Sequence, residues 1–274
     1  MYIGIDVGGT SIRVASFNTL NNPKLVRSIY LETLNNYQED LKNICTAILS
    51  LCDSPLGIGM GIPGILDKEH SMILKLPNVR SWDGQATKAD LEKKLKTKVF
   101  LANDAEAAAM GEARWGYGID KSFLFIIWGS GVGGTAVDIA DKKIVVSPFE
   151  PGHFEVRQDG IADGIGVKGS LDALCGGAGI IRSYGKPAAT LSESEWLRVE
   201  KDFAKGLVTI LTIRPSNLII FGGGITVKQS SRIRVIHKMV KHELRVFAPP
   251  EKMLVSKFGE ETGLYGALAL LKRR

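Results

Sequence analysis

Three short glycine-rich segments, each directly after an apolar run, are the first candidates for chemistry in this sequence. They are Gly8-Gly9, Gly129 to Gly134, and Gly222 to Gly224. Glycine has no Cβ, so backbone N–H groups in such turns can approach an anion closely. None of the turns matches the Walker pattern, and the second leads into a strand, so the dinucleotide fingerprint fails its context test. Each turn alone is equally compatible with a simple hairpin, but together they indicate a nucleotide whose phosphates they hold.

Two aspartates stand at predicted strand ends. Asp6 precedes the first glycine turn. A carboxylate beside phosphates needs a cation between them, and Mg²⁺ bridges carboxylates to phosphate oxygens; the alternative is an aspartate that bonds its own turn. Asp104 follows Asn103 and opens an Ala-rich stretch. It can be a general base for an attacking hydroxyl, or the pair can simply cap a helix, and the residues alone favour neither interpretation.

The composition is that of an ordinary globular protein. Hydrophobic residues make up 45% and charged residues 23% of the 274 positions, which excludes disordered, collagen-like and disulfide-scaffold classes. The formal net charge of +6 suits an anionic ligand. The one dense basic run, Lys272 to Arg274, indicates a solvated tail, so no nucleic-acid partner is expected. Three cysteines without a CxxC pair favour a reducing compartment, and no signal peptide or long apolar run is visible, so we expect a cytoplasmic protein that binds no membrane.

The apolar patterning predicts alternating strands and helices. A β-hairpin is expected from residues 2–5 and 12–17 around the first glycine turn, and the same arrangement recurs at residues 123–128 and 135–139. Further strands are predicted at residues 56–61, 99–102 and 217–221, and helices at residues 38–52, 87–96, 104–115, 193–213 and 263–271. The repetition indicates an α/β fold of two lobes with a cleft between them. We expect a first lobe of residues 1–105, rejoined by residues 255–274, and a second lobe of residues 106–254.

Taken in order, these residues resemble the ROK family of sugar kinases, a branch of the actin-like ATPase (ribonuclease H-like) fold. Asp6 to Thr10 is similar to the family's first phosphate motif, D-x-G-G-T, with Ser11 where the family commonly has Lys. The other matching segments are Ile58–Asp67 (G-x-G-x-P-G-x-V-D), Pro77–Trp82 (P-N-x-x-x-W), Asn103–Ala105 (N-D-A), Gly129–Gly134 (G-T-G-x-G-G), Glu150–His153 (E-x-G-H) and Gly222–Gly224 (the adenosine motif).

The resemblance implies a role for each matching residue. Asp104 is the implied catalytic base. The residues implied to hold the sugar are Gly64, Asn103, Asp104, Glu150, His153 and Asp172. The residues implied to hold ATP are Asp6, Gly8, Gly9, Thr10, Ser11, Gly131, Val132, Gly133, Gly134, Gly223 and Gly224, with Mg²⁺ near Asp6 through water.

The sequence departs from the family at the sugar end. Many members bind a structural zinc through this histidine and three cysteines, but the cysteine positions hold Asp163, Ile165 and Ser170. A structural zinc needs about four N or S ligands, so no structural zinc is expected. Asp172 stands where the family has a glutamate, and the loop before the E-x-G-H motif is shortened to Val146–Phe149.

The resemblance thus implies an ATP-dependent hexose kinase that transfers the γ-phosphoryl group to a sugar hydroxyl, most simply the 6-hydroxyl of glucose. An N-acetylhexosamine or fructose kinase remains an alternative, as does polyphosphate as the donor. A sugar-sensing protein without catalysis and an ATPase that drives a partner protein are two further alternatives. The implied partners are a small-molecule sugar and a nucleotide, and the family suggests a homodimer.

Overall fold

Two compact units make up the chain in this computed structural model, which describes residues 1–76 and 79–272. The first unit comprises Met1–Ile119 and Glu261–Arg274, and the second comprises Asp120–Glu260. Pro77 and Asn78 of the P-N-x-x-x-W segment, and the last two residues of the basic tail, lie outside the described residues. The first unit continues past residue 105 because the helix that follows packs against the C-terminal helix of the same unit.

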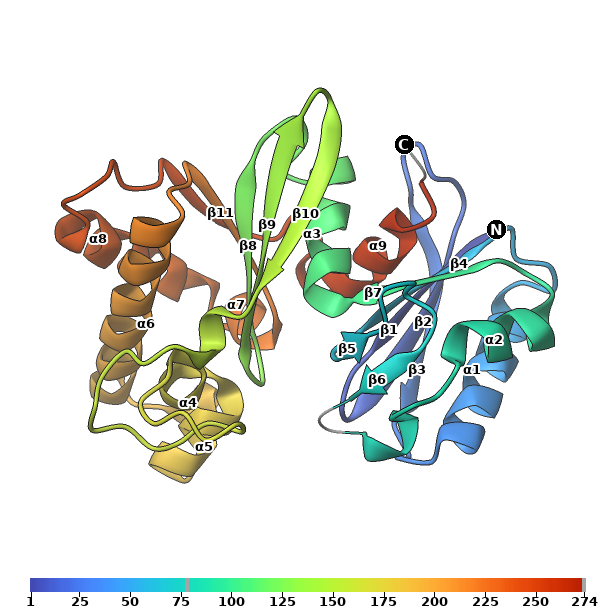
Figure 1. Cartoon of the computed structure of the whole chain (residues 1–274), viewed down its shortest axis with the longest axis horizontal. Coiled ribbons are helices and arrows are strands. Elements are labelled where there is room, and N and C mark those ends of the chain that lie inside the picture. Colours follow the sequence, from blue (N-terminus) through green and yellow to red (C-terminus); the bar gives the residue numbers. More distant parts are fainter. Residues whose placement is uncertain (77–78, 273–274) are drawn as a thin grey trace. The chain divides into compact units, whose positions relative to one another are not determined.

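A mixed five-stranded sheet of order β3-β2-β1-β4-β7 forms the centre of the first unit (Figure 1). Its strands are β1 Tyr2–Val7, β2 Ser11–Phe17, β3 Leu25–Glu32, β4 Ile58–Ile62 and β7 Val99–Asn103. Strands β1, β2 and β3 pair antiparallel, whereas β1, β4 and β7 pair parallel. Its helices are α1 Tyr37–Leu51, α2 Thr87–Leu95, α3 Asp104–Trp115 and α9 Thr262–Ala269. The smaller elements are β5 Ile65–Leu66, β6 Ile73–Lys75, η1 Arg80–Trp82 and, at the boundary between the units, η4 Gly259–Glu261.

The second unit repeats this topology with the sheet order β10-β9-β8-β11-β12, which confirms the predicted repetition of one supersecondary unit. Its strands are β8 Phe123–Trp128, β9 Val132–Ala140, β10 Lys143–Phe149, β11 Leu218–Gly222 and β12 Lys252–Val255. Its helices are α4 Leu171–Cys175, α5 Gly177–Tyr184, α6 Glu193–Ile213, α7 Gly224–Lys228 and α8 Ser230–Glu243, with 3₁₀ turns η2 Pro151–His153 and η3 Ala188–Thr190.

Most predicted elements are confirmed, and the missed strands share a position. Helix α6 begins and ends at the predicted residues, since Ser192 and Glu195 form a capping box at its start. In the two five-stranded sheets, the strands that the sequence did not predict are β3, β10 and β12, and all three are at sheet edges; the short strands β5 and β6, which form a separate two-stranded sheet, were not predicted either. Val146–Phe149, expected as a loop, are the last residues of β10, because they pair with β9. No helix within the described residues is long and apolar enough to span a membrane.

Helix α9 lies directly on the backbone of the first sheet at two glycines. A Cβ on Gly4 would come within 2.6 Å of the carbonyl oxygen of Leu264, and a Cβ on Gly59 within 1.8 Å of that of Ala267. The other face of the same strands carries Ile3, Ile58 and their apolar neighbours, which are buried with α1. Helix α9 in turn packs closely against α3, at Gly111 of α3 and Gly266 of α9.

Gly59→Ala should lower the free energy of unfolding of the protein by about 2–3 kcal/mol, because the added methyl group forces α9 away from the sheet. Urea denaturation measures the loss. Gly164→Ala is the matched control, since a Cβ there meets nothing within 4 Å. Equal stabilities of the two variants would contradict the close contact between α9 and β4.

Candidate active site

Residues from three distant parts of the sequence meet at one edge of the first sheet. Strands β1, β4 and β7 run parallel, and their register pairs Asp6 with Gly61 and Ile62 with Asn103. The segments that follow these strands therefore leave the sheet side by side. They are the glycine turn at residues 8–10, Pro63-Gly64, and the start of α3. Carboxyl ends of parallel strands are where open α/β folds bind their ligands.

Asn103 and Asp104 occupy the junction between β7 and α3. The Asn103 side chain accepts from the Ala105 N–H group at 2.9 Å and donates to the Gly64 carbonyl at 3.2 Å. It therefore caps α3 and also ties that helix to the turn after β4. The Asp104 carboxylate, which is partly exposed, accepts from the same Ala105 N–H group at 2.9 Å. The N-terminus of α3 favours the charged form of this carboxylate.

Asp6 forms an ion pair that the sequence analysis did not predict. The Arg13 guanidinium donates to Asp6 Oδ2 at 2.6 Å, from the position directly opposite in the β1–β2 hairpin. Burial raises the pKa of the Asp6 carboxyl, and the Arg13 charge and hydrogen bond partly offset that rise. Gly263, at the start of α9, makes room for the carboxylate, since a Cβ there would lie 2.4 Å from Oδ2.

Arg13→Met should cost about 2 kcal/mol of stability at about pH 7.5, because it leaves a buried carboxylate without its cation. The raised pKa of Asp6 means that the folded state holds this proton more tightly than the unfolded chain does. Ionisation therefore opposes folding, and the loss should grow as the pH rises above about 4. Urea unfolding at about pH 4.5 and 7.5 measures this difference.

The double variant Asp6→Asn with Arg13→Met provides the control for that experiment. It removes the carboxylate along with its partner and should recover much of the stability that Arg13→Met loses at the higher pH. An equal loss from Arg13→Met at both pH values would show that Arg13 acts through other contacts.

The first glycine turn is closed tightly. The Gly8 N–H group donates to the Ser11 carbonyl at 2.8 Å, and the Gly8 carbonyl accepts from Thr33 Oγ1 at 3.0 Å. Thr10 is exposed at the tip, whereas Gly9 and Ser11 are partly exposed. The turn therefore has the hydrogen bonds of a simple hairpin, which was one of the two interpretations of its sequence. It lies at the same edge of the sheet as Asp6.

The second unit brings its two glycine-rich turns together in the same way. Strands β8 and β11 are parallel, with Ile127 opposite Gly222. A Cβ on Gly129 would lie 3.5 Å from the Gly224 nitrogen, so the two turns are neighbours. Gly223 has a positive φ of 94°, and a Cβ there would lie 2.5 Å from the Trp128 carbonyl oxygen. Only glycine fits that close approach.

Strand β9 begins at Val132, earlier than the predicted residue 135, so Val132, Gly133 and Gly134 belong to the strand and not to the turn. The Val132 N–H group donates to Asp172 Oδ1 at 2.8 Å. A Cβ on Gly131 would come within 2.6 Å of that same oxygen. Asp172, expected at the sugar, therefore supports the second glycine-rich turn directly. Burial raises the pKa of the Asp172 carboxyl, although the Val132 hydrogen bond lowers it in part.

Glu150 directly precedes the 3₁₀ turn η2, and His153 is the last residue of that turn. Gly152 packs closely there, since its Cβ would lie 2.3 Å from the Val132 carbonyl oxygen and 3.2 Å from Asp172 Cβ. The E-x-G-H segment is therefore seated against the second glycine-rich turn. Glu150 is exposed, and one third of the His153 side chain (33%) is exposed. Within this unit, Glu150, His153 and Asp172 thus belong to one region.

The residues at the family's zinc positions do not fit a zinc ion. Ile165 has no ligand atom, and Ser170 Oγ donates to Asp163 Oδ2 at 2.8 Å while accepting from the Ala173 N–H group at 3.1 Å. The Asp163 carboxylate bonds His153 Nδ1 at 2.8 Å and two backbone N–H groups. Tetrahedral zinc requires about four N, S or O ligands whose lone pairs are available. Within residues 1–76 and 79–272, no group of three or more metal-ligating side chains is arranged around one point.

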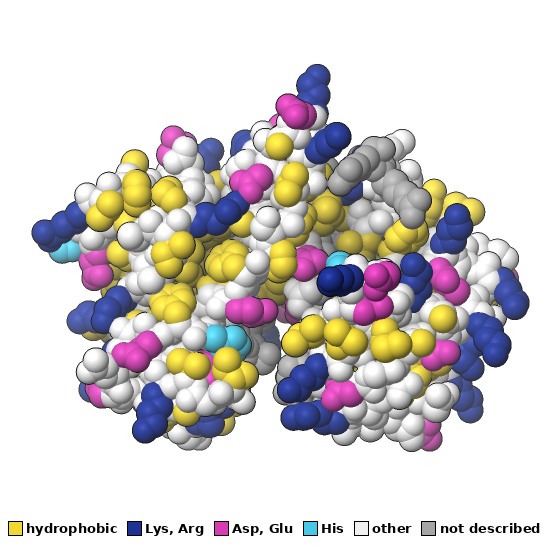
Figure 2. Space-filling model, viewed as in Figure 1, with side chains coloured by type: hydrophobic (Ala, Val, Ile, Leu, Met, Phe, Trp, Pro, Cys, Tyr) yellow, Lys and Arg dark blue, Asp and Glu magenta, His cyan; other side chains and the backbone are white. Residues whose placement is uncertain are grey.

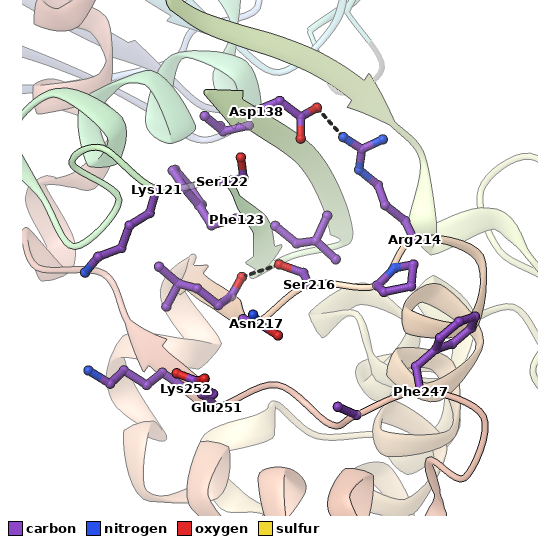
Figure 3. Close-up of a pocket in the computed structure, with 15 residues that line it drawn as sticks. Lys121, Ser122, Phe123, Asp138, Arg214, Ser216, Asn217, Phe247, Glu251 and Lys252 are labelled. Carbon is purple, nitrogen blue, oxygen red and sulfur yellow. Dashed lines mark hydrogen bonds and ion pairs between the residues drawn. The ribbon is translucent and has the colours of Figure 1, made fainter. Parts of the chain in front are cut away.

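A cavity of about 700 Å³ lies elsewhere in the second unit (Figure 3). It is found where β8, β11 and β12 begin, at Phe123, Leu218 and Lys252. An ion pair between Arg214 and Asp138 borders it. Its lining includes none of the candidate residues, and the two glycine-rich turns of this unit lie at the opposite ends of β8 and β11. On the faces seen in Figure 2, lysine and arginine side chains are scattered among acidic ones.

Three side chains that support the candidate residues were assigned no role from the sequence: Arg13, Asp163 and Ser170. In a two-stranded hairpin around the first glycine turn, Arg13 stands directly across from Asp6. Opposite charges at such a cross-strand pair could have predicted the ion pair from the sequence. Asp163 precedes a Gly-Ile-Gly segment, which is typical of an aspartate that bonds the backbone N–H groups of its own loop.

The comparisons with known proteins agree with this geometry. The model of the "ROK family" matches residues 2–274. A glucokinase of Thermotoga maritima is 25% identical over 99% of this chain and 97% of its own length, and an N-acetyl-D-glucosamine kinase of Vibrio parahaemolyticus is 28% identical over 98% and 99%. The crystal structure of a ROK family glucokinase from Streptomyces griseus, in complex with glucose and AMPPNP, superposes with a TM-score of 0.75 at 22% identity, covering 98% of each chain.

The repeated five-stranded sheets and the likeness to that structure define the class: the protein has the two-unit, actin-like ATPase fold. The chain belongs to the ROK family.

Proposed function

We propose that this protein is an ATP-dependent hexose kinase with glucose as its first candidate substrate. The observation that carries the proposal is the position of Asp104, at the N-terminus of α3 and beside Asn103 and the Gly64 turn. Membership of the ROK family and the relatives named glucokinase and N-acetyl-D-glucosamine kinase support the reaction class. A carboxylate at a helix N-terminus, where the helix dipole favours the charged form, suits a base that receives the proton of an attacking hydroxyl.

Asp104 accepts the proton of the sugar hydroxyl as its oxygen attacks the γ-phosphoryl group. Because phosphoryl transfer passes through a loose transition state, the carboxylate also contributes by orienting that hydroxyl. Asn103 presents its amide next to Asp104, and Gly64 offers its backbone. In the second unit, Glu150 and His153 take further sugar hydroxyls, while Asp172 holds the region in shape through Val132.

The nucleotide is assigned to the glycine turns. Gly8, Gly9, Thr10 and Ser11 serve in the first unit. In the second unit, the assigned residues are Gly131, Val132, Gly133, Gly134, Gly223 and Gly224. The Val132 N–H group donates to Asp172, so it can reach a phosphate only when that bond opens. Asp6 offers a carboxylate at the strand edge beside the first turn and would hold Mg²⁺ through water, which fits this ion's preference for few carboxylates and several waters. When bound, the ion neutralises charge on the phosphate oxygens.

A panel of sugars tests the reaction and its substrate. ADP release should require a hexose, and glucose should give the highest kcat/KM, with N-acetylglucosamine, N-acetylmannosamine and fructose as the alternatives. N-acetylglucosamine is included because the relative with that substrate in its name is as similar as the glucokinase. Polyphosphate in place of ATP tests the donor. ATP hydrolysis unaffected by any sugar would contradict the kinase proposal and favour an ATPase.

Asp104→Asn should lower kcat at least about a hundredfold while sugar binding is retained, because the amide cannot accept the proton. Calorimetric sugar binding measured beside turnover separates the two effects. Asp53→Asn, an exposed carboxylate of the same unit, is the control and should be fully active. Full activity of Asp104→Asn would show that another group is the base. Sugar binding by the unaltered protein without any turnover would favour a sensor.

Two further parts of the proposal concern the setting of the enzyme. The cysteines in the described residues, Cys45, Cys52 and Cys175, are all free thiols, which supports the cytoplasm as the compartment. The homodimer suggested by the family stays a prediction.

A further inference from the structure

A fully buried carboxylate lies in the loop between η2 and α4. The Asp163 side chain has 0% exposure and receives four hydrogen bonds. Its Oδ1 accepts from the backbone N–H groups of Ile165 at 3.0 Å and Val167 at 2.9 Å. Its Oδ2 bonds Ser170 Oγ at 2.8 Å and His153 Nδ1 at 2.8 Å. All four distances lie within the normal range for hydrogen bonds.

The proton positions in this cluster follow from the donor inventory. Ser170 Oγ accepts from the Ala173 N–H group, so its own hydrogen is free to point at Asp163 Oδ2. Burial alone would raise the pKa of Asp163, but the His153, Ser170 and backbone hydrogen bonds lower it to about 2. Asp163 is therefore ionised at neutral pH and can only accept. The hydrogen between Asp163 and His153 must be carried by the imidazole.

We propose that Asp163 is a positioning residue that fixes His153 with its proton on Nδ1, so that Nε2 is presented as a hydrogen-bond acceptor. Within the described part of the chain, Nε2 bonds no protein group, and one third of the side chain is exposed. The neighbouring Gly152 packs on the Val132 carbonyl and on Asp172, which sets the ring beside the second glycine-rich turn. A carboxylate thus performs, without a metal ion, the task of holding this imidazole.

The consequence for the ligand rests on the proposed function. An acceptor nitrogen selects a group that can donate, so the sugar position that meets His153 must carry a free O–H group. Fluorine at that position keeps an acceptor but supplies no donor, and it should therefore be as unfavourable as hydrogen. Where a site is built around one polar partner, the loss of that partner is costly.

Asp163→Asn inverts this arrangement without changing the shape of the side chain. The two backbone N–H groups require an acceptor at Oδ1, so the amide oxygen must take that place and the NH₂ group must face His153 and Ser170. The amide then donates to Nδ1, which moves the imidazole proton to Nε2. Its second hydrogen can go to Ser170 Oγ, and the hydroxyl hydrogen of Ser170 then loses the Oδ2 acceptor that it has in the unaltered protein.

Nitrogen-15 NMR of histidine-labelled protein tests the inference directly. The sequence has only four histidines, and His153→Gln identifies the resonances of the ring. At about pH 8.5, where free imidazole is neutral, the unaltered protein should show an Nδ1–H tautomer. Asp163→Asn should show mainly Nε2–H. Ser170→Ala, which removes a bond to the same Oδ2 without offering a donor, should keep Nδ1–H.

An Nε2–H tautomer in the unaltered protein would overturn the inference even if Asp163→Asn failed to fold. An unchanged tautomer in a folded Asp163→Asn protein would overturn it as well. Thermal unfolding of each variant shows whether the loop is still folded, and so separates unfolding of the loop from a change in the tautomer of His153.

Kinetics with deoxy and deoxyfluoro sugars supply the second readout. At one ring position, both replacements should lower kcat/KM about tenfold in the unaltered protein, as loss of one hydrogen bond would. Asp163→Asn should raise the KM for the unmodified sugar about tenfold and leave the KM for ATP unchanged. Ser170→Ala should change neither by more than about threefold. A fluoro sugar that works as well as the parent at every position would contradict the acceptor role. Failure of all sugars to stimulate turnover would contradict the proposed function while leaving the NMR result to decide the tautomer.

Discussion

The parallel pairing of β1, β4 and β7 is the constraint on which the first half of the candidate site depends. Backbone hydrogen bonds fix the register of these strands, so that Asp6, Gly61 and Asn103 end at one edge although they are far apart in the sequence. The glycines of β1 and β4 then allow α9 to lie on the sheet, and α9 supports α3, whose first residue is Asp104. The second unit uses the same arrangement to bring two glycine-rich turns together. The strand that a residue follows therefore decides which other candidate residues lie beside it.

Three aspartates of the candidate site, one fully buried and two partly buried, show how the number of hydrogen-bond donors shifts the pKa of a carboxyl group. Asp172 has a single backbone N–H group as hydrogen-bond donor, and burial raises its pKa. Asp6 has one guanidinium, and burial still raises its pKa. Asp163 has four donors, and its pKa falls to about 2. A low-dielectric environment penalises a charge unless enough dipoles face it, so these aspartates differ in chemistry although they are the same residue type.

The loop of residues 153–170 illustrates how a family can keep a fold and change its means of support. With Asp163, Ile165 and Ser170 in place of cysteines, the loop is held by hydrogen bonds to one carboxylate and not by a metal ion. Such a cluster restrains the imidazole of His153 in direction and also in tautomer, which a purely steric packing would not do.

The sequence by itself determined the repeated strand–turn–strand units, most central elements and the candidate residues, because apolar periodicity, glycine and helix-capping residues act over a few neighbouring positions. Helix α6 could be predicted to its ends from such local signals. The edge strands β3, β10 and β12 could not, since an edge strand is half exposed and lacks a continuous apolar run. Only the tertiary structure decided that Arg13 meets Asp6, that Asp172 holds Val132 and that Asp163 holds His153. Hydrogen bonds of this kind are determined by distances across strands and loops, which composition and spacing do not specify.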